Sequence, residues 1–197
     1  LEPADVSIAG VPAPIISFVI LAAALLLFSY IISRRFQLLR KMMPDNRFSN
    51  IGERLWLMLV YGFGQARQPR YLGAGILHIL LFAGFMILSL RSLTLIGRGF
   101  YSSFHLPFLT GNVAFVYEVL KDYTVLMVLV VCIIAIIRRA VFKPARYAHK
   151  PGEGHENEAY IILGMVSGLM VTDMIFDGAT FSAAGQTGMA TYFPAAA

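Results

Sequence analysis

One histidine stands inside a long apolar run, and it is the residue of this sequence best suited to chemistry. His78 lies within the run 71–90, and an ionisable side chain inside a segment of membrane-spanning length is costly and commonly functional. A neutral imidazole is also a common axial ligand of haem iron. Ala74, Gly75 and Gly84 leave room for a flat macrocycle beside the helix. His78 therefore has two interpretations, an axial haem ligand or a histidine hydrogen-bonded to a neighbouring helix.

The other three histidines lie outside the apolar runs. His105 is in one connection, and His149 and His155 are in another. One histidine supplies one axial ligand. A haem held by two histidines would therefore need its second ligand from outside the four apolar runs, either from a further helix or from another subunit.

Two arginines, Arg67 and Arg70, directly precede the run that contains His78. Haem propionates are anionic, and the guanidinium fork of arginine suits carboxylates. We therefore consider both arginines as candidate cofactor-binding residues. The other interpretation is that they only anchor the start of the helix, which Pro69 marks, at the membrane surface.

His105 is a candidate for quinone chemistry. It stands in Phe104-His105-Leu106-Pro107, beside aromatic and apolar residues. An imidazole in this setting could bind a quinone carbonyl and transfer its proton. The other interpretation is a loop that dips into the lipid headgroups.

Three charged residues, Glu118, Lys121 and Asp122, fall within about one helical turn near the start of the third apolar segment. Residues three or four apart on a helix can form ion pairs. These residues therefore either pair with one another or belong to a proton path or a quinone site.

A carboxylate, Asp173, lies inside the fourth apolar run, and Asp177 follows on the same helical face. A buried carboxylate must be paired or protonated. Lys121 or Arg91 is the predicted partner of Asp173, because all three lie toward the same, outer side. A structural ion pair and a role in proton transfer both stay open for Asp173 and Lys121.

The composition predicts a membrane protein. The 197 residues are 58% apolar and only 14% charged, with a mean hydropathy of +0.71, whereas soluble domains average about 25% charged residues. The net charge of +5 comes without a basic patch interleaved with aromatic residues, so we expect no nucleic-acid partner. The single cysteine, Cys132, excludes an intrachain disulfide and a cysteine-ligated iron–sulfur cluster or structural zinc held by this chain alone.

Four segments are long enough to cross a hydrocarbon core, which needs about 20 apolar residues per helix. Their length and the absence of alternation favour helices over strands. The predicted spans are about 13–32, 71–95, 113–137 and 159–176.

The distribution of cations predicts the topology. Thirteen of the sixteen Lys and Arg residues lie in the connections 33–70 and 138–158, and the positive-inside rule places such loops in the cytoplasm. The N-terminus then faces outward. Within the first connection, 51–63 has the pattern of an amphipathic surface helix with Asn50 as its cap. The small residues of 164–168 predict a close helix–helix contact.

The fold class is therefore predicted as an all-α integral membrane protein of four transmembrane helices plus an amphipathic surface helix. We expect residues 1–178 to form one transmembrane domain. Residues 179–197 are predicted to be an outer-side tail that leads to a missing segment, because the four helices look like part of a bundle of five or more.

Several short motifs occur in a characteristic order. They are Tyr61-Gly62-Phe63-Gly64-Gln65-Ala66-Arg67, Gly75-Ile76-Leu77-His78, Phe82-Ala83-Gly84-Phe85, Phe104-His105-Leu106-Pro107 and Met170-Val171-Thr172-Asp173. In this order they resemble the membrane domain of iron–sulfur oxidoreductases related to heterodisulfide reductase, a domain that is similar to the nitrate reductase gamma subunit. The resemblance covers about 50–178.

The resemblance implies a respiratory, haem b electron-transfer domain in the cytoplasmic (inner) membrane of a bacterium or archaeon. It implies exchange of electrons with a quinone, menaquinone or ubiquinone, and a cytoplasmic partner domain or subunit that carries [4Fe–4S] clusters in cysteine-rich domains. Some members resemble oxidoreductases that take electrons from electron-transfer flavoprotein. His78 corresponds to the haem ligand, whereas Arg67, Arg70, His105 and Asp173 correspond only to motif positions.

The chain departs from the gamma-subunit pattern, which has five spans with ligand histidines on the second and fifth. Four spans and one histidine imply at most one haem, completed by another segment. Two other functions stay open: a small ion or solute transporter or channel whose polar path is lined by the charged residues, and a redox-silent membrane anchor of a peripheral enzyme.

Overall fold

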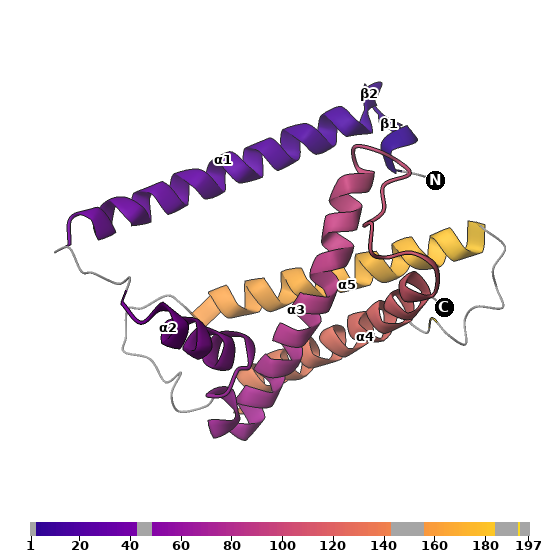
Figure 1. Cartoon of the computed structure of the whole chain (residues 1–197). Helices are drawn as coiled ribbons and strands as arrows, with labels where there is room; N and C mark the ends of the chain where they lie inside the picture. The colour runs from indigo at the N-terminus through magenta and orange to yellow at the C-terminus, as the bar shows by residue number, and fades with distance from the viewer. Residues whose placement is uncertain (1–2, 43–48, 143–155, 184–192, 194–197) are drawn as a thin grey trace. The chain divides into compact units, whose positions relative to one another are not determined.

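The computed structural model of the protein describes residues 3–42, 49–142, 156–183 and 193, and these residues are largely helical (Figure 1). In chain order the elements are η1 (Pro3–Asp5), β1 (Ser7–Ile8), β2 (Val11–Pro12), α1 (Ala13–Arg40), α2 (Ile51–Leu57), η2 (Met58–Phe63), η3 (Gln68–Arg70), α3 (Leu72–Arg98), α4 (Gly111–Phe142) and α5 (Glu156–Ala183). The elements η1 and η3 are 3₁₀ helices, and η2 is a π-helix.

The four predicted spans are confirmed as long helices. Within the described residues, α1, α3, α4 and α5 are long and apolar enough to cross a membrane. The all-α class is therefore correct. His149 and His155, together with most of the second cationic connection, lie outside the described residues.

The helices are longer than the apolar runs that predicted them. The helix α1 continues to Arg40, α4 ends at Phe142 and α5 continues to Ala183. The helix α5 therefore extends past the predicted start of the tail at 179, because 179–183 is helical. Hydropathy marks only the part of a helix that suits hydrocarbon, whereas its backbone hydrogen bonds continue into polar sequence.

The segment 51–63 is helical and begins directly after Asn50 as predicted, but Asn50 does not cap the helix through its side chain. Asn50 has a left-handed backbone (φ 56°) and makes no capping hydrogen bond through its side chain. Its carbonyl instead accepts the backbone N–H of Arg54 at 3.1 Å. Asparagine tolerates this backbone region better than most residues, which explains its presence here. From Met58 to Phe63 the segment continues as the π-helix η2.

The chain divides into two compact units. The first unit comprises residues 1–67 and 93–105, and the second comprises residues 68–92 and 106–197. The helix α3 therefore contributes most of its length to the second unit and its last residues to the first.

In the first unit, two short features shape the ends of α1 and α3. The strands β1 and β2 pair in an antiparallel hairpin directly before α1. After α3, the ring of Phe104 lies against Gly97, where a Cβ would collide with it. The Arg98 Nε donates to the Phe104 carbonyl at 3.3 Å. These contacts fold the start of the 99–110 connection back onto the end of α3.

In the second unit, α4 packs against α5. Val125, Val128 and Cys132 of α4 form a buried cluster with Met170 of α5. These α4 positions are three and four residues apart, so they share one helical face. This apolar centre holds α4 and α5 together.

The helix α3 reaches α4 through a glycine. At Gly84 a Cβ would collide with the Val128 side chain, so the absence of a side chain is what permits this approach. The small residue therefore serves helix packing at this position, and not open space for a cofactor.

The glycines of 164–168 do not make the close contact that was predicted. A Cβ on Gly164 or Gly168 would meet no described atom within 4 Å. The helix α5 instead turns Leu163, Val166 and Met170 toward the apolar centre. The two glycines lie on another face of the helix.

Candidate functional site

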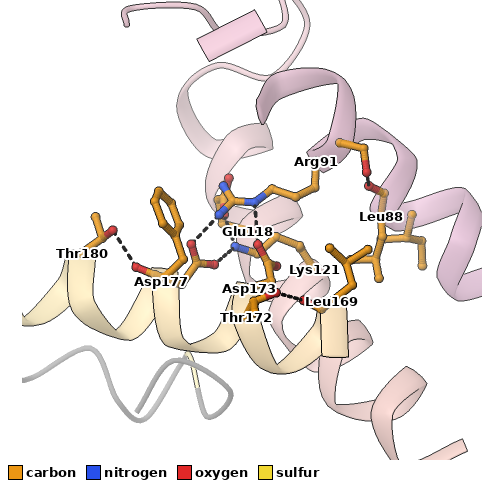
Figure 2. Close-up of polar contacts among 12 residues, drawn as sticks. Leu88, Arg91, Glu118, Lys121, Leu169, Thr172, Asp173, Asp177 and Thr180 are labelled. Atoms are coloured by element: carbon orange, nitrogen blue, oxygen red, sulfur yellow. Dashed lines mark hydrogen bonds and ion pairs between the residues drawn. The ribbon is translucent and has the colours of Figure 1, made fainter. Parts of the chain in front are cut away.

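Five charged side chains from three helices of the second unit form one chain of ion pairs (Figure 2). Arg91 of α3 donates through Nε to Asp173 Oδ1 at 3.4 Å and through Nη2 to Asp177 Oδ1 at 2.5 Å. Lys121 of α4 donates to the second oxygen of Asp177 and pairs with Glu118 at 2.9 Å. The order of the chain is Glu118–Lys121–Asp177–Arg91–Asp173.

Four of the five side chains are largely buried. The Lys121 side chain is 4% exposed, whereas that of Glu118 is 44% exposed. The side chains of Arg91, Asp173 and Asp177 are 8%, 12% and 13% exposed. Buried charges are tolerated when they are paired and hydrogen-bonded, and here both cations lie between carboxylates. The cluster therefore has a sealed interior and one accessible end, at Glu118.

The local helical spacing produces this arrangement. Asp173 and Asp177 are four residues apart on α5 and present two carboxylates on one face, while Glu118 and Lys121 are three apart on α4. Of the two partners predicted for Asp173, Lys121 or Arg91, the structure shows Arg91. The predicted pairing within the α4 group is confirmed for Glu118 with Lys121.

Asp177 contacts both cations and is the centre of the cluster, which the sequence did not indicate. It falls one residue after the apolar run that defined the fourth span, so its burial was not expected. The spacing of four residues had placed it on the same helical face as Asp173, but no partner was predicted for it. The extension of α5 to Ala183 is what carries this carboxylate into the interior.

Other side chains surround the cluster. The Tyr117 hydroxyl donates to the Ile87 carbonyl of α3 at 3.1 Å, and the Phe176 ring lies 5.8 Å from the Arg91 guanidinium. Asp122 of α4 is also buried and has an interaction of its own. These contacts further link α3, α4 and α5 at this level.

His78 lies in the same unit but is not part of the ion-pair cluster. It lines a cavity of about 270 Å³ between η3, α3, α4 and α5. Arg138 and Arg139, from the C-terminal part of α4, line the same cavity. Its other lining residues are Gln68, Tyr71, Ala74, Gly75, Leu77, Leu81, Ala135 and Leu163. The cavity thus combines an imidazole, two guanidiniums and apolar walls.

The cavity fits one half of a haem site. His78 offers one axial nitrogen, and the two arginines offer donors for carboxylates. The volume lies just below the usual range of ligand pockets, about 300–1,000 Å³. Gly75 does not enlarge the cavity, because a Cβ there would collide with the Gln68 carbonyl. A macrocycle would therefore extend out of the cavity toward a further covering segment.

Three other residues, Arg67, Arg70 and His105, were predicted from the sequence as site residues. Arg70 belongs to the same unit as His78 but is exposed and does not line the cavity. Arg67 belongs to the first unit, where its guanidinium lies 4.5 Å from the Tyr61 ring. His105 is exposed in that unit, and its Nδ1 is 2.9 Å from the Ser103 carbonyl.

Arg138 and Arg139 are the residues that the sequence reasoning missed as cofactor candidates. They were counted only as cations of the second cytoplasmic connection. The available signal was their position one helical turn after Ala135, in a helix that continues to Phe142. The Arg139 guanidinium also lies 5.4 Å from the Tyr160 ring of α5, which orients it between the two helices.

Within the described residues, no three His, Cys, Asp or Glu side chains come together as a metal site. Comparisons with models of known families, with curated proteins and with solved structures find no match to this chain.

Proposed function

We propose that this chain is the membrane domain of a respiratory oxidoreductase that passes electrons between cytoplasmic iron–sulfur clusters and a membrane quinone through haem b. The observation that carries the proposal is the shared cavity of His78, Arg138 and Arg139 between three apolar helices. A haem needs an axial ligand and partners for its propionates. The imidazole of a membrane-spanning helix and the two guanidinium groups beside it are groups of these two kinds.

Each residue has a defined task in this proposal. His78 would hold the iron through a ring nitrogen. Arg138 and Arg139 would hold the propionates at the N-terminal end of α3, where the main chain of Gln68 closes the cavity against Gly75. When bound, haem b supplies a one-electron relay. The second axial ligand would come from a further helix or a partner subunit, which would also cover the open side of the cavity.

The ion-pair cluster lies farther along α3 than His78. Arg91 is 13 positions after His78, which corresponds to about 20 Å along a helix axis. The positive-inside rule puts His78 in the cytoplasmic half of the membrane and the cluster in the outer half. We place electron entry from the iron–sulfur partner near His78, and the quinone near the outer ends of the helices.

Two observations favour this function over transport. Each of the four apolar helices is continuous over its described length, whereas transporter sites are commonly built on broken helices. The charged residues are paired with one another inside the helix packing instead of lining an open path.

The test is a reduced-minus-oxidised visible spectrum of the protein, purified from membranes with its natural partners, beside a His78→Ala variant. We expect a b-type α-band that the variant loses, because one axial ligand is gone. His78→Met is expected to keep the haem and raise its reduction potential, since Met/His ligation does so.

His105→Ala is the matched control, because His105 is an exposed histidine of the other unit. Its spectrum is expected to equal that of the unmodified protein. A complex without any b-type band, or a band that His78→Ala leaves intact, would contradict the proposal and favour the transporter or anchor function.

A further inference from the structure

The last turns of α1 carry positive charge that the proposed function does not use. Arg34, Arg35, Arg40 and Lys41 fall close together in the sequence, and α1 itself contains no Asp or Glu. All residues from 23 to 42 are exposed. Among the described residues, no carboxylate forms an ion pair with any of these four cations. This end of the helix therefore offers its positive charges to an anion that approaches from outside.

The length of α1 places these charges at the surface of a membrane. The apolar part of the helix, 13–32, spans about 30 Å, which equals the thickness of the hydrocarbon core. Arg34 and Arg35 follow within about 5 Å along the axis, inside a headgroup layer that is about 5–8 Å thick on each side of a bilayer. Lys41 lies farther out, but helical side chains tilt toward the N-terminus, so its ammonium group is carried back toward the same layer.

Three of the four cations line one groove. The groove has a volume of about 430 Å³, and its lining residues are Arg34, Arg35, Gln37, Leu38 and Lys41. Positions 34, 38 and 41 are four and three residues apart, so they share one face of the helix. Arg40 does not line the groove. Charge at this end of α1 is therefore concentrated on one face.

The same face continues into the apolar part of the helix. Tyr30 lies one turn before Arg34, and its hydroxyl accepts a hydrogen bond from Arg34 Nη1 at 3.2 Å. This bond holds the guanidinium at the boundary of the hydrocarbon and leaves its other N–H groups for an anion. Leu27 and Ile31, farther along this face, are 60% and 45% exposed. The face thus joins a row of cations to an exposed apolar row.

We propose that this face of α1 binds one anionic phospholipid. Arg34, Arg35 and Lys41 hold the phosphate, for which guanidinium groups have a matching geometry, and the acyl chains lie along Leu27 and Ile31. Charge complementarity selects the headgroup, because a zwitterionic lipid brings a cation of its own into the groove. The exposed apolar row selects a lipid over a soluble phosphate. The site is independent of haem binding at His78.

This proposal differs from the positive-inside rule in what it requires of each cation. The rule counts Lys and Arg residues near the end of a span, and the face that they occupy does not enter it. A lipid site requires cations on the face that forms the groove. Arg34→Gln and Arg40→Gln change the net charge of the chain equally, so a comparison of these two variants separates the two effects.

The experiment is native mass spectrometry of the full chain in a neutral detergent, titrated with phosphatidylglycerol or with phosphatidylcholine. We expect one phosphatidylglycerol to bind more tightly than any phosphatidylcholine. Arg34→Gln, Arg35→Gln and Lys41→Gln should each weaken this binding roughly fivefold, the usual contribution of one cation near an anionic lipid surface. Arg40→Gln is the matched control and should change it less than about twofold. All four positions are exposed, so the substitutions leave the helix packing intact.

A photoreactive phosphatidylglycerol locates the lipid, and its adducts are expected within 27–41. Three results would overturn the proposal: equal weakening by Arg34→Gln and Arg40→Gln, equal binding of the two lipids, or adducts confined to other segments. Displacement of the lipid by millimolar glycerol 3-phosphate would also overturn it, because the groove would then be a site for a soluble phosphate. The b-type spectrum should be the same in all these variants, so the outcome does not depend on the proposed electron transfer.

Discussion

Two neighbouring cations, Arg138 and Arg139, belong to the proposed cofactor site. In the sequence they were counted only as cations of a basic connection. Both line the cavity with His78. In contrast, Arg70 is exposed and outside the cavity. The distinction is testable, because a cation close to a haem stabilises the reduced form, which carries less positive charge than the oxidised form.

Removal of either cavity arginine should therefore lower the haem reduction potential. For Arg138→Gln and Arg139→Gln we expect a decrease of roughly tens of millivolts, as for loss of one charge at about 10 Å in a medium of intermediate dielectric constant. Arg70→Gln is the matched control and should leave the potential unchanged. A potentiometric titration of the b-type band measures all three. A shift confined to Arg70→Gln would reverse the assignment.

The residue types of the polar cluster could be predicted from the sequence, but its centre could not. Buried charges require opposite charges, and this rule gave Lys121 or Arg91 as the partner of Asp173, of which the structure shows Arg91. Asp177 was placed on the same helical face as Asp173, but its ion pairs with both cations were not predicted, because the hydropathy criterion stopped at Phe176, before the helix itself ended. Arg138 and Arg139 were missed because a count of charges over a connection carries no information about which face of a helix a cation occupies.

At the scale of helices, Gly84 is the position that sets how closely α3 approaches α4. A Cβ there would collide with Val128 of α4. Gly84→Ala should therefore destabilise the protein by about 1–3 kcal/mol, the usual range for overpacking. Val128→Ala should restore much of the loss when the two changes are combined, because it removes the methyl group in the way.

Thermal unfolding in detergent measures this double-mutant cycle. Gly164→Ala is the control, since no described atom lies within 4 Å of a Cβ at that position, and alanine favours a helix over glycine. If Gly84→Ala were as stable as Gly164→Ala, the close approach of α3 to α4 would not exist.

The number, order and approximate cores of the helices followed from apolar length alone, because no other element satisfies its backbone within hydrocarbon. Helix ends did not follow, because they depend on tertiary contacts such as the burial of Asp177. The small residues of α3 and α5 could be recognised but not assigned, since a glycine that admits a neighbour looks the same in sequence as one that faces open space. Gly84 and Gly164 illustrate the two cases.

At the scale of the whole molecule, the positive-inside rule predicts which side of the membrane each connection occupies. The protein is convenient for a labelling test, because its single cysteine, Cys132, is 0% exposed. Gln37→Cys at the exposed end of α1 and Tyr101→Cys in the connection after α3 each add one accessible thiol. In intact cells a membrane-impermeant thiol reagent should label the second variant and not the first.

Permeabilised cells supply the control for that experiment, because both variants should then react. Labelling of Gln37→Cys in intact cells would invert the topology. The cavity of His78 would then face outward, and the cytoplasmic iron–sulfur partner would lose its access to it.

The ion-pair cluster also has a consequence for biosynthesis. Both carboxylate partners of Arg91 lie on α5, and Asp177 follows it by 86 residues. At about 5–20 residues per second, synthesis needs roughly 4–17 s to cover that distance. An arginine within a membrane-spanning helix is costly, and α3 is synthesised before the carboxylates that pair with Arg91. The ion pairs of Arg91 with Asp173 and Asp177 can therefore form only after α5 has been synthesised.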